Sequence, residues 1–292
     1  MLAAASRLAD AEIDTPQLDS AVLLAHVLSV SKAWLYAHPR RQLTKDEIGK
    51  YEALVRRRMC HEPTAYLIGY RSFYGLDVTV DRRVLIPRPE TEMLVERVLA
   101  HLKEMIGEGQ TPRVVDVGTG SGAIATAIAV NVPQVVVYAT DVSEDALQVA
   151  AQNVWRYGLG EQVQLIPGDL LDALPRGLRR AGLPEPVDVI VANLPYVATP
   201  ALQGLARQVR DYEPILALDG GPDGLQVIGH FFRSLQTPAG RGMLRPEARL
   251  YLEIGMDQGA AARAIAESAF PEARVEVHVD YAGLDRVVQV AT

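Results

Sequence analysis

The tetrapeptide Asn193-Leu194-Pro195-Tyr196 combines residue types that can hold a planar amide or amine nitrogen. Such a nitrogen is a poor nucleophile because its lone pair is delocalised, and acceptors on its N–H bonds help it to react. Asn193 offers a side-chain oxygen as one acceptor. The carbonyl of Leu194 offers a second, since Pro195 interrupts helix or sheet pairing here. We therefore expect two acceptors to hold one NH2 group.

Tyr196 adds a flat face on which a planar amide or base can stack. A methyl group carried on a sulfonium can then approach in line, and no strong base is needed because sulfur loses its positive charge as the methyl moves. The rate gain would come mostly from positioning and hydrogen-bond electrostatics. Asn-x-Pro after a strand is also ordinary turn chemistry, so the place of the tetrapeptide in the fold decides its interpretation.

A second candidate site is the segment Gly118-Thr119-Gly120-Ser121-Gly122, which follows a strand-like apolar run. Alternate glycines let the backbone turn tightly and approach a ligand. Asp141 ends the next expected strand 21 residues beyond Gly120, where a carboxylate can accept both hydroxyls of a ribose. The same spacing fits a dinucleotide fingerprint that holds a pyrophosphate. The loop therefore leaves a nicotinamide dehydrogenase open as a rival to an enzyme that uses a nucleoside methyl donor.

Acidic residues near two strand ends extend this candidate site. Asp169 can accept a hydrogen bond from an adenine amino group while Leu170 packs near the ring, although Asp169 also suits a helix N-cap. Asp116 either orients a methionine ammonium through water or is an acid satisfied by its neighbours. Both interpretations of Asp116 stay open.

These residues need a scaffold that brings several strand ends together. After Pro89 the sequence alternates helix and strand, which is typical of an α/β fold with a doubly wound parallel sheet. The connection at residues 281–284 is too short for a parallel crossover, so the last strand should be antiparallel. This predicts a seven-stranded Rossmann-like methyltransferase sheet. The expected strands are 113–117, 135–140, 163–167, 187–192, 250–254, 274–279 and 286–290.

The first part of the chain has a different pattern. Apolar residues recurring at three and four predict helices up to about residue 60, with starts at Asp14 or Thr15 and at Thr44, whose Glu47 completes a capping box. Aromatics, glycines and alternating apolar residues as far as Ile86 then predict a β-hairpin. We expect a small helical domain at 1–65, a β-hairpin linker at 66–89 and a methyltransferase domain at 90–292.

The charge is unevenly distributed between the two parts of the chain. Residues 1–90 hold 13 Lys/Arg against 11 Asp/Glu, whereas residues 91–292 hold 16 against 25, so the larger part is acidic. Stable binding of nucleic acid needs many cations, and we expect none. The basic run Arg56-Arg57-Arg58 is interpreted as a solvated helix face, with contact to a partner as the alternative.

Composition also indicates the cellular compartment of the protein and which kinds of site it lacks. No apolar run approaches the length of a membrane span, the first residues do not resemble a signal peptide, and Cys60 is the single cysteine. We therefore expect a cytoplasmic protein without disulfides or membrane contact. The six histidines show no metal-ligand spacing, so we expect no metal.

At this point the chain resembles the HemK/PrmC family, which methylates the glutamine of the Gly-Gly-Gln motif in peptide chain release factors. The resemblance spans nearly the whole chain, and its most specific element is Pro87-Arg88-Pro89-Glu90. The matching segments are 24–28, 62–69, 85–92, 116–122, 213–214, 218–221 and 223–225, together with the tetrapeptide.

The resemblance implies that S-adenosylmethionine is the cofactor, with S-adenosylhomocysteine as the product. Residues 118–122, Asp141 and Leu170 would bind it, with Asn193 near its methionine moiety, and residues 193–196 would bind the substrate glutamine. Leu194 departs from the family's usual proline, and Leu170 stands where an aromatic is common. The family places the segment 87–92 over the active site, where Arg88 would meet a carboxylate. The alternative, which is compatible with it, is that the two prolines set the entry to the first helix of the large domain, with Glu90 and Glu92 in its first turn. The partners would be release factors, and we expect a monomer.

Other functions are compatible with parts of the pattern. An adenine-amino (N6) DNA or RNA methyltransferase uses the same NH2 contacts, but the acidic large domain disfavours it. A dehydrogenase is disfavoured by the tetrapeptide and the antiparallel last strand. An inactive cofactor-binding adaptor is disfavoured because the residues from Asn193 to Tyr196 are intact.

Overall fold

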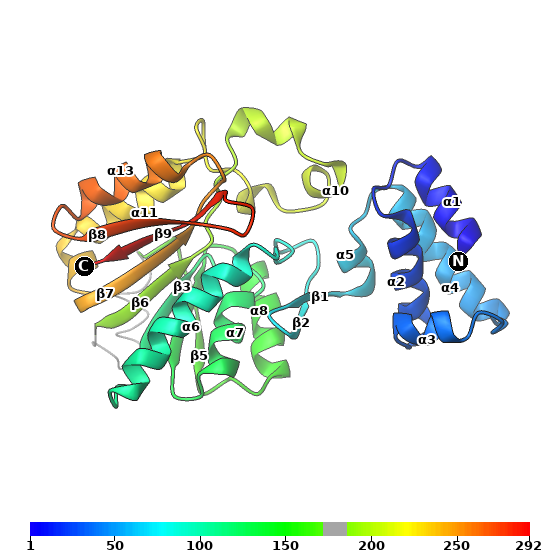
Figure 1. Cartoon of the computed structure of the whole chain (residues 1–292), viewed down its shortest axis with the longest axis horizontal. Helices are drawn as coiled ribbons and strands as arrows, with labels where there is room; N and C mark the ends of the chain where they lie inside the picture. Colours follow the sequence, from blue (N-terminus) through cyan, green and yellow to red (C-terminus); the bar gives the residue numbers. More distant parts are fainter. Residues whose placement is uncertain (172–185) are drawn as a thin grey trace. The chain divides into compact units, whose positions relative to one another are not determined.

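The computed structural model describes residues 1–171 and 186–292 (Figure 1). They form two compact units, one of Met1–Tyr70 with Leu205–Tyr212 and the other of Arg71–Gly204 with Glu213–Thr292. The first unit therefore extends past residue 65 and includes a segment from much later in the chain. The domain limits at 65 and 89 stay a prediction.

The first unit is helical. Its core surrounds Leu8, Leu23 and Val55. The predicted capping box is present, because the Glu47 amide donates to Thr44 Oγ1 and the Thr44 amide donates to the Glu47 carboxylate. The helices are α1 (Leu2–Asp10), α2 (Pro16–Leu28), α3 (Lys32–Ala37), α4 (Lys45–Met59), α5 (Thr64–Ile68) and α10 (Arg207–Arg210).

The interpretation of the arginine run on α4 as a solvated face was wrong for Arg58. Its side chain is buried, and Nε donates to Asp19 Oδ2 at 2.6 Å while Nη2 donates to Gln208 Oε1 at 3.0 Å. Arg56 and Arg57 are exposed, and Arg57 pairs with Glu62. Successive helical residues point in directions about 100° apart, so one of three consecutive arginines turns inward.

The second unit is built on a seven-stranded sheet of order β5-β4-β3-β6-β7-β9-β8. Neighbouring strands are parallel except that β9 is antiparallel to both β7 and β8. The predicted antiparallel last strand is thus confirmed. The strands are β3 (Arg113–Val117), β4 (Val136–Asp141), β5 (Val163–Pro167), β6 (Val187–Ala192), β7 (Leu244–Glu253), β8 (Arg274–Val279) and β9 (Asp285–Ala291).

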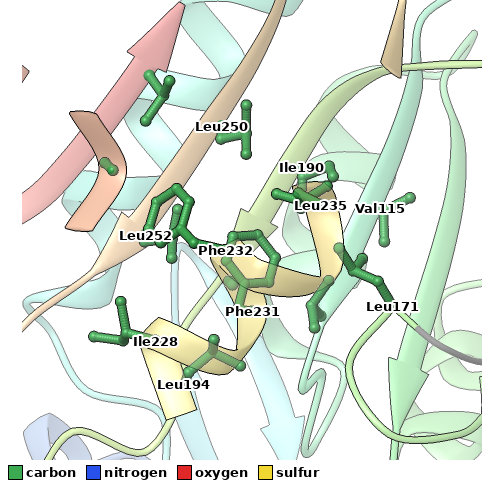
Figure 2. Packing of buried hydrophobic residues seen from close by; sticks show 14 of the residues in the cluster. Val115, Leu171, Ile190, Leu194, Ile228, Phe231, Phe232, Leu235, Leu250 and Leu252 are labelled. Carbon is green, nitrogen blue, oxygen red and sulfur yellow. The ribbon is translucent and has the colours of Figure 1, made fainter. Parts of the chain in front are cut away.

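Helices cover both faces of this sheet, with α6, α7 and α8 on one side and α11 and α13 on the other (Figure 1). The central strands β3 and β6 are buried along nearly their whole length, because both faces of the sheet are covered. On one face, Val115 and Ile190 lie in the core cluster with Phe231 and Phe232 of α11 (Figure 2). The helical segments are α6 (Thr91–Gly107), α7 (Ala123–Asn131), α8 (Glu144–Arg156), η1 (Thr199–Gly204), η2 (Ile215–Ala217), α11 (Gln226–Gln236), α12 (Pro238–Arg241) and α13 (Gly259–Ala269).

The hairpin linker is shorter than the sequence pattern indicated. Only β1 (Tyr70–Phe73) and β2 (Leu76–Thr79) form its two-stranded sheet, and Tyr66 lies in α5. Residues 84–86 are not in a strand, because this stretch runs into the two prolines of the segment 87–89. Within the described residues, no helix combines the length and apolar character that crossing a membrane requires.

Candidate active site

The glycine loop turns directly out of β3 through left-handed backbone. Gly118, Gly120 and Gly122 have φ of 70°, 55° and 75°. A Cβ at Gly122 would lie 3.1 Å from the Cβ of Ala150, so a larger residue would push the loop away from α8. These glycines are therefore required by backbone conformation and by close helix packing.

Asp141, at the end of β4, lies next to this loop. Its Oδ2 accepts from the Gly120 amide at 2.8 Å and its Oδ1 accepts from the Ser143 amide at 2.9 Å. Burial raises the pKa of Asp141, against these backbone hydrogen bonds, which lower it. Each carboxylate oxygen has a second lone-pair direction, so Asp141 can accept further hydrogen bonds from a ligand.

A cavity of about 250 Å³ opens where β3, β4, β5 and β6 end at their carboxyl sides. This is the place where open parallel sheets bind ligands. Its walls include most of the residues predicted from the sequence, namely Gly118, Thr119, Gly120, Ser121, Asp141, Asp169, Leu170, Asn193, Leu194 and Pro195. Gly122 and Tyr196 do not line it. The binding roles of all these residues stay predictions.

Other walls of the cavity come from segments to which the residue chemistry had assigned no role. The segment that leads into α6 contributes Arg83 and Leu85, and the first residue of α6 is Thr91. The region of η2 contributes Pro214 and Leu216. No polar spacing pattern identifies these residues. For Leu85, Thr91 and Pro214 the only signal was the resemblance of the segments 85–92 and 213–214, and for Arg83 and Leu216 there was none.

The tetrapeptide leaves β6 level with the glycine loop. Asp116 pairs with Val191 and Val117 with Ala192, so a Cβ at Gly118 would lie 3.9 Å from the Asn193 carbonyl oxygen. The Asn193 Nδ2 donates to Thr91 Oγ1 at 3.2 Å. Its Oδ1 accepts no hydrogen bond from the residues that the structure describes.

The backbone carbonyls of this stretch differ in their partners. The Tyr196 carbonyl accepts from Gln258 Nε2 at 2.9 Å, and the Val197 carbonyl accepts from the Gly220 amide at 2.8 Å. Across residues 1–171 and 186–292, no group donates to the Leu194 carbonyl. Two acceptors, Asn193 Oδ1 and the Leu194 carbonyl, are therefore available at the cavity wall.

The Leu194 side chain points away from these acceptors into the core. It is 3% exposed and belongs to the cluster with Ile228 and Phe231 (Figure 2). Its Cδ2 lies 3.3 Å from the position of a Cβ at Gly118. The leucine thus supports the glycine loop from below.

An ion pair joins two segments that line the cavity. Arg88 Nη2 donates to Glu213 Oε1 at 2.7 Å, and the Ile86 amide donates to Glu213 Oε2 at 3.1 Å. The expected carboxylate partner of Arg88 is thus present. Burial raises the pKa of Glu213 and Arg88 lowers it, so the pair holds a carboxylate in an unfavourable environment.

Two fully buried carboxyls lie near the cavity. Burial raises the pKa of both Asp116 and Glu253 to about 7. Asp116 Oδ2 accepts from Thr119 Oγ1 at 2.6 Å and from the Ala125 amide, but its Oδ1 has no partner among the described residues. This half-satisfied state leaves both interpretations of Asp116 open.

Comparison with known proteins agrees with this architecture. The family model of the PrmC N-terminal domain matches residues 2–69, and that of a methyltransferase domain matches residues 114–212. A crystal structure of the hMettl16 catalytic domain in complex with a MAT2A 3'UTR hairpin has a TM-score of 0.55 and 16% identity, covering 78% of this chain and 81% of that one. This similarity concerns the fold alone.

Curated relatives match over almost the entire length. A release factor glutamine methyltransferase of Moorella thermoacetica is 42% identical, covering 97% of this chain and 94% of the relative. One of Chlorobaculum tepidum is 37% identical, covering 95% and 91%. On this full-length similarity, the chain belongs to the family of release factor glutamine methyltransferases.

Proposed function

We propose that this protein transfers a methyl group from S-adenosylmethionine to the side-chain amide nitrogen of the glutamine in the Gly-Gly-Gln motif of peptide chain release factors. The observation that carries the proposal is the pair of available acceptors, Asn193 Oδ1 and the Leu194 carbonyl, beside the glycine loop. The family membership supports the same substrate.

The residues around the glycine loop fit the methyl donor. Three left-handed glycines leave room for close approach, and Asp141 retains lone pairs for the hydroxyls of a ribose. Asp169 and Leu170 lie on the cavity wall, where we assign them to the adenine. When bound, S-adenosylmethionine supplies an electrophilic methyl on a positively charged sulfur.

Asn193 and Leu194 would orient the substrate amide. Each accepts one N–H of the glutamine NH2 group, which holds the nitrogen in place and raises its electron density. The nitrogen gains the methyl and becomes cationic, and it then loses one proton to solvent. In this proposal Tyr196 supplies the stacking face, although its hydroxyl is directed toward Glu253 at 3.4 Å.

A protein substrate suits the charge of the chain. Residues 91–292 hold 16 Lys/Arg against 25 Asp/Glu, which disfavours stable contact with a phosphate backbone. We therefore propose a release factor as the macromolecular partner of a monomeric enzyme and keep the adenine-amino reaction as the outcome to be excluded.

The test is a methylation assay with labelled S-adenosylmethionine. Recombinant release factor and adenine-containing DNA and RNA are offered separately, and mass spectrometry maps the label. We expect one methyl group on the glutamine of Gly-Gly-Gln and none on a release factor in which that glutamine is replaced by asparagine. Label on adenine alone would overturn the proposal.

A further inference from the structure

Behind the tetrapeptide lies a buried carboxyl that the proposed mechanism does not use. Glu253, the last residue of β7, is 2% exposed. The Tyr196 hydroxyl donates to its Oε1 at 3.4 Å, which is long for such a bond. The other oxygen, Oε2, is fully buried and accepts no formed hydrogen bond among the described residues. A buried carboxylate oxygen of this kind calls for a donor.

A candidate donor is Thr91, the buried first residue of α6, whose formed side-chain contact is with Asn193. Its hydroxyl interacts with the Glu253 carboxyl and lowers the pKa of that group, against the larger effect of burial. Thr91 Oγ1 accepts from Asn193 Nδ2 at 3.2 Å, and within the described chain its own proton has no other acceptor. Thr91 thus stands between Glu253 and the side-chain amide of Asn193.

The chemistry of these three groups gives the chain of hydrogen bonds one direction. An ionised carboxylate can only accept, so the hydroxyl beside it donates. Because the Thr91 hydroxyl donates its one proton to Glu253, it can only accept a hydrogen bond from Asn193. The donor in Asn193 must then be its NH2 group. The oxygen of the amide is then the side that faces the cavity.

We infer that Thr91 and Glu253 are positioning residues that fix which way the Asn193 side-chain amide points. The inference rests on the proposed function, because it concerns how the substrate NH2 group meets an acceptor. With the amide turned over, Asn193 would present its own NH2 to the NH2 of the substrate, and one of the two acceptors would be lost.

The test is a double-mutant cycle on the full-length protein with a release factor as substrate. T91V removes the hydroxyl at nearly constant volume, T91S restores it, and N193A removes the amide that Thr91 is inferred to orient. The matched control is T126V, since Thr126 is a buried threonine of α7 whose hydroxyl has no partner in the described chain. Measurements are kcat, KM for the release factor and the midpoint of thermal unfolding.

We expect T91V to lower kcat/KM about 10-fold, the scale of one lost hydrogen bond, and T91S to recover most of that loss. In the N193A background T91V should have almost no further effect, because the two residues act as one unit. T126V should retain the kinetic constants of the parent protein.

Two outcomes would overturn the inference: the same loss from T91V with and without Asn193, or no loss from T91V at all. A midpoint of unfolding that falls equally in T91V and T91S would mark a structural role instead. Failure of the unsubstituted protein to methylate any release factor is a different result, because it would remove the proposed function itself.

Discussion

At the scale of single residues, the backbone and the side chain of Leu194 have different roles in the tetrapeptide. Its carbonyl accepts no hydrogen bond within the described residues, whereas its side chain is buried beneath Gly118. The family's usual proline would present the same carbonyl with a smaller, stiffer side chain. The structure therefore explains how leucine can stand here, since it fills core volume without occupying the acceptor position.

Replacing Leu194 should distinguish these tasks. L194A leaves a cavity under the glycine loop and should lower the free energy of unfolding by about 2–4 kcal/mol. L194P keeps the carbonyl and should retain kcat within about an order of magnitude of the parent protein, since the acceptor is unchanged. Denaturant unfolding and methylation kinetics check both, with L284A at an exposed position as the control. A loss of activity in L194P as large as that in N193A, with stability unchanged, would show that retaining the carbonyl is not sufficient for activity.

Asn193 carries the other acceptor. N193A should reduce kcat about 100-fold or more, the scale seen when one positioned polar group is lost at a reacting centre. Stability should change little, because the single described partner of its side chain is Thr91. N131A, at an exposed asparagine that ends α7, serves as the matched control in the same assay. Unchanged turnover in N193A would make the tetrapeptide a structural turn.

At the scale of elements, the sequence predicts four strands with their limits, namely β3, β5, β6 and β8. Burial alone does not explain this, because β5 is partly exposed and β8 mostly so. Each is a short run of strand-forming residues beside a turn, and such a run leaves one interpretation. β7 was expected from residue 250 but begins at Leu244. Its first half was not predicted because it contains Pro246 and, at Glu247, left-handed backbone, neither of which is typical of a strand. Helix α11 was missed although its apolar residues recur with helical spacing.

The residues of the candidate site could likewise be predicted from the sequence only in part. Residues at strand ends could be predicted because the topology of a parallel sheet brings those ends together. Thr91 and Glu253 could not, since their connection to Asn193 depends on where the start of α6 and the end of β7 lie in space. Arg58 was misjudged for the same reason, because its partner Asp19 is 39 residues away along the chain.

The loop at residues 218–224 holds the tetrapeptide through close backbone contacts. A Cβ at Gly224 would lie 2.3 Å from the Tyr196 carbonyl oxygen, and φ at Gly224 is +75°. G224A should therefore displace the tetrapeptide, lower the unfolding midpoint and reduce kcat more than stability alone explains. Thermal unfolding and single-turnover methylation test this. The control is G204A, where an added Cβ has nothing within 4 Å and φ is not in the positive region. Equal behaviour of the two variants would contradict the expectation.

At the scale of the whole molecule, the fold places carboxyls where their charge is costly. Asp116 and Glu253 are both buried on the central sheet, and both have a pKa of about 7. A folded-state pKa above the ordinary value means that folding favours the protonated form. Stability and the proposed activity therefore make opposite demands on Glu253, because only the ionised carboxyl is restricted to accepting a hydrogen bond from Thr91.

The opposite demands predict opposite pH profiles. The stability contributed by protonated Glu253 is complete below its ordinary pKa and is lost as pH rises through about 7, while kcat/KM should rise over the same range. Arg286 and the Thr91 and Tyr196 hydroxyls lower this pKa, whereas Glu90 and burial raise it. E253Q should flatten the kcat/KM profile and reduce the fall in unfolding midpoint between about pH 5 and about pH 8.5, with the slope due to Asp116 remaining. Thermal scans and kinetics at each pH measure both trends, with E272Q at an exposed position as the control. If E253Q keeps the slopes of the parent protein, the titrating group is not Glu253, and the carboxyl is not ionised in the working enzyme.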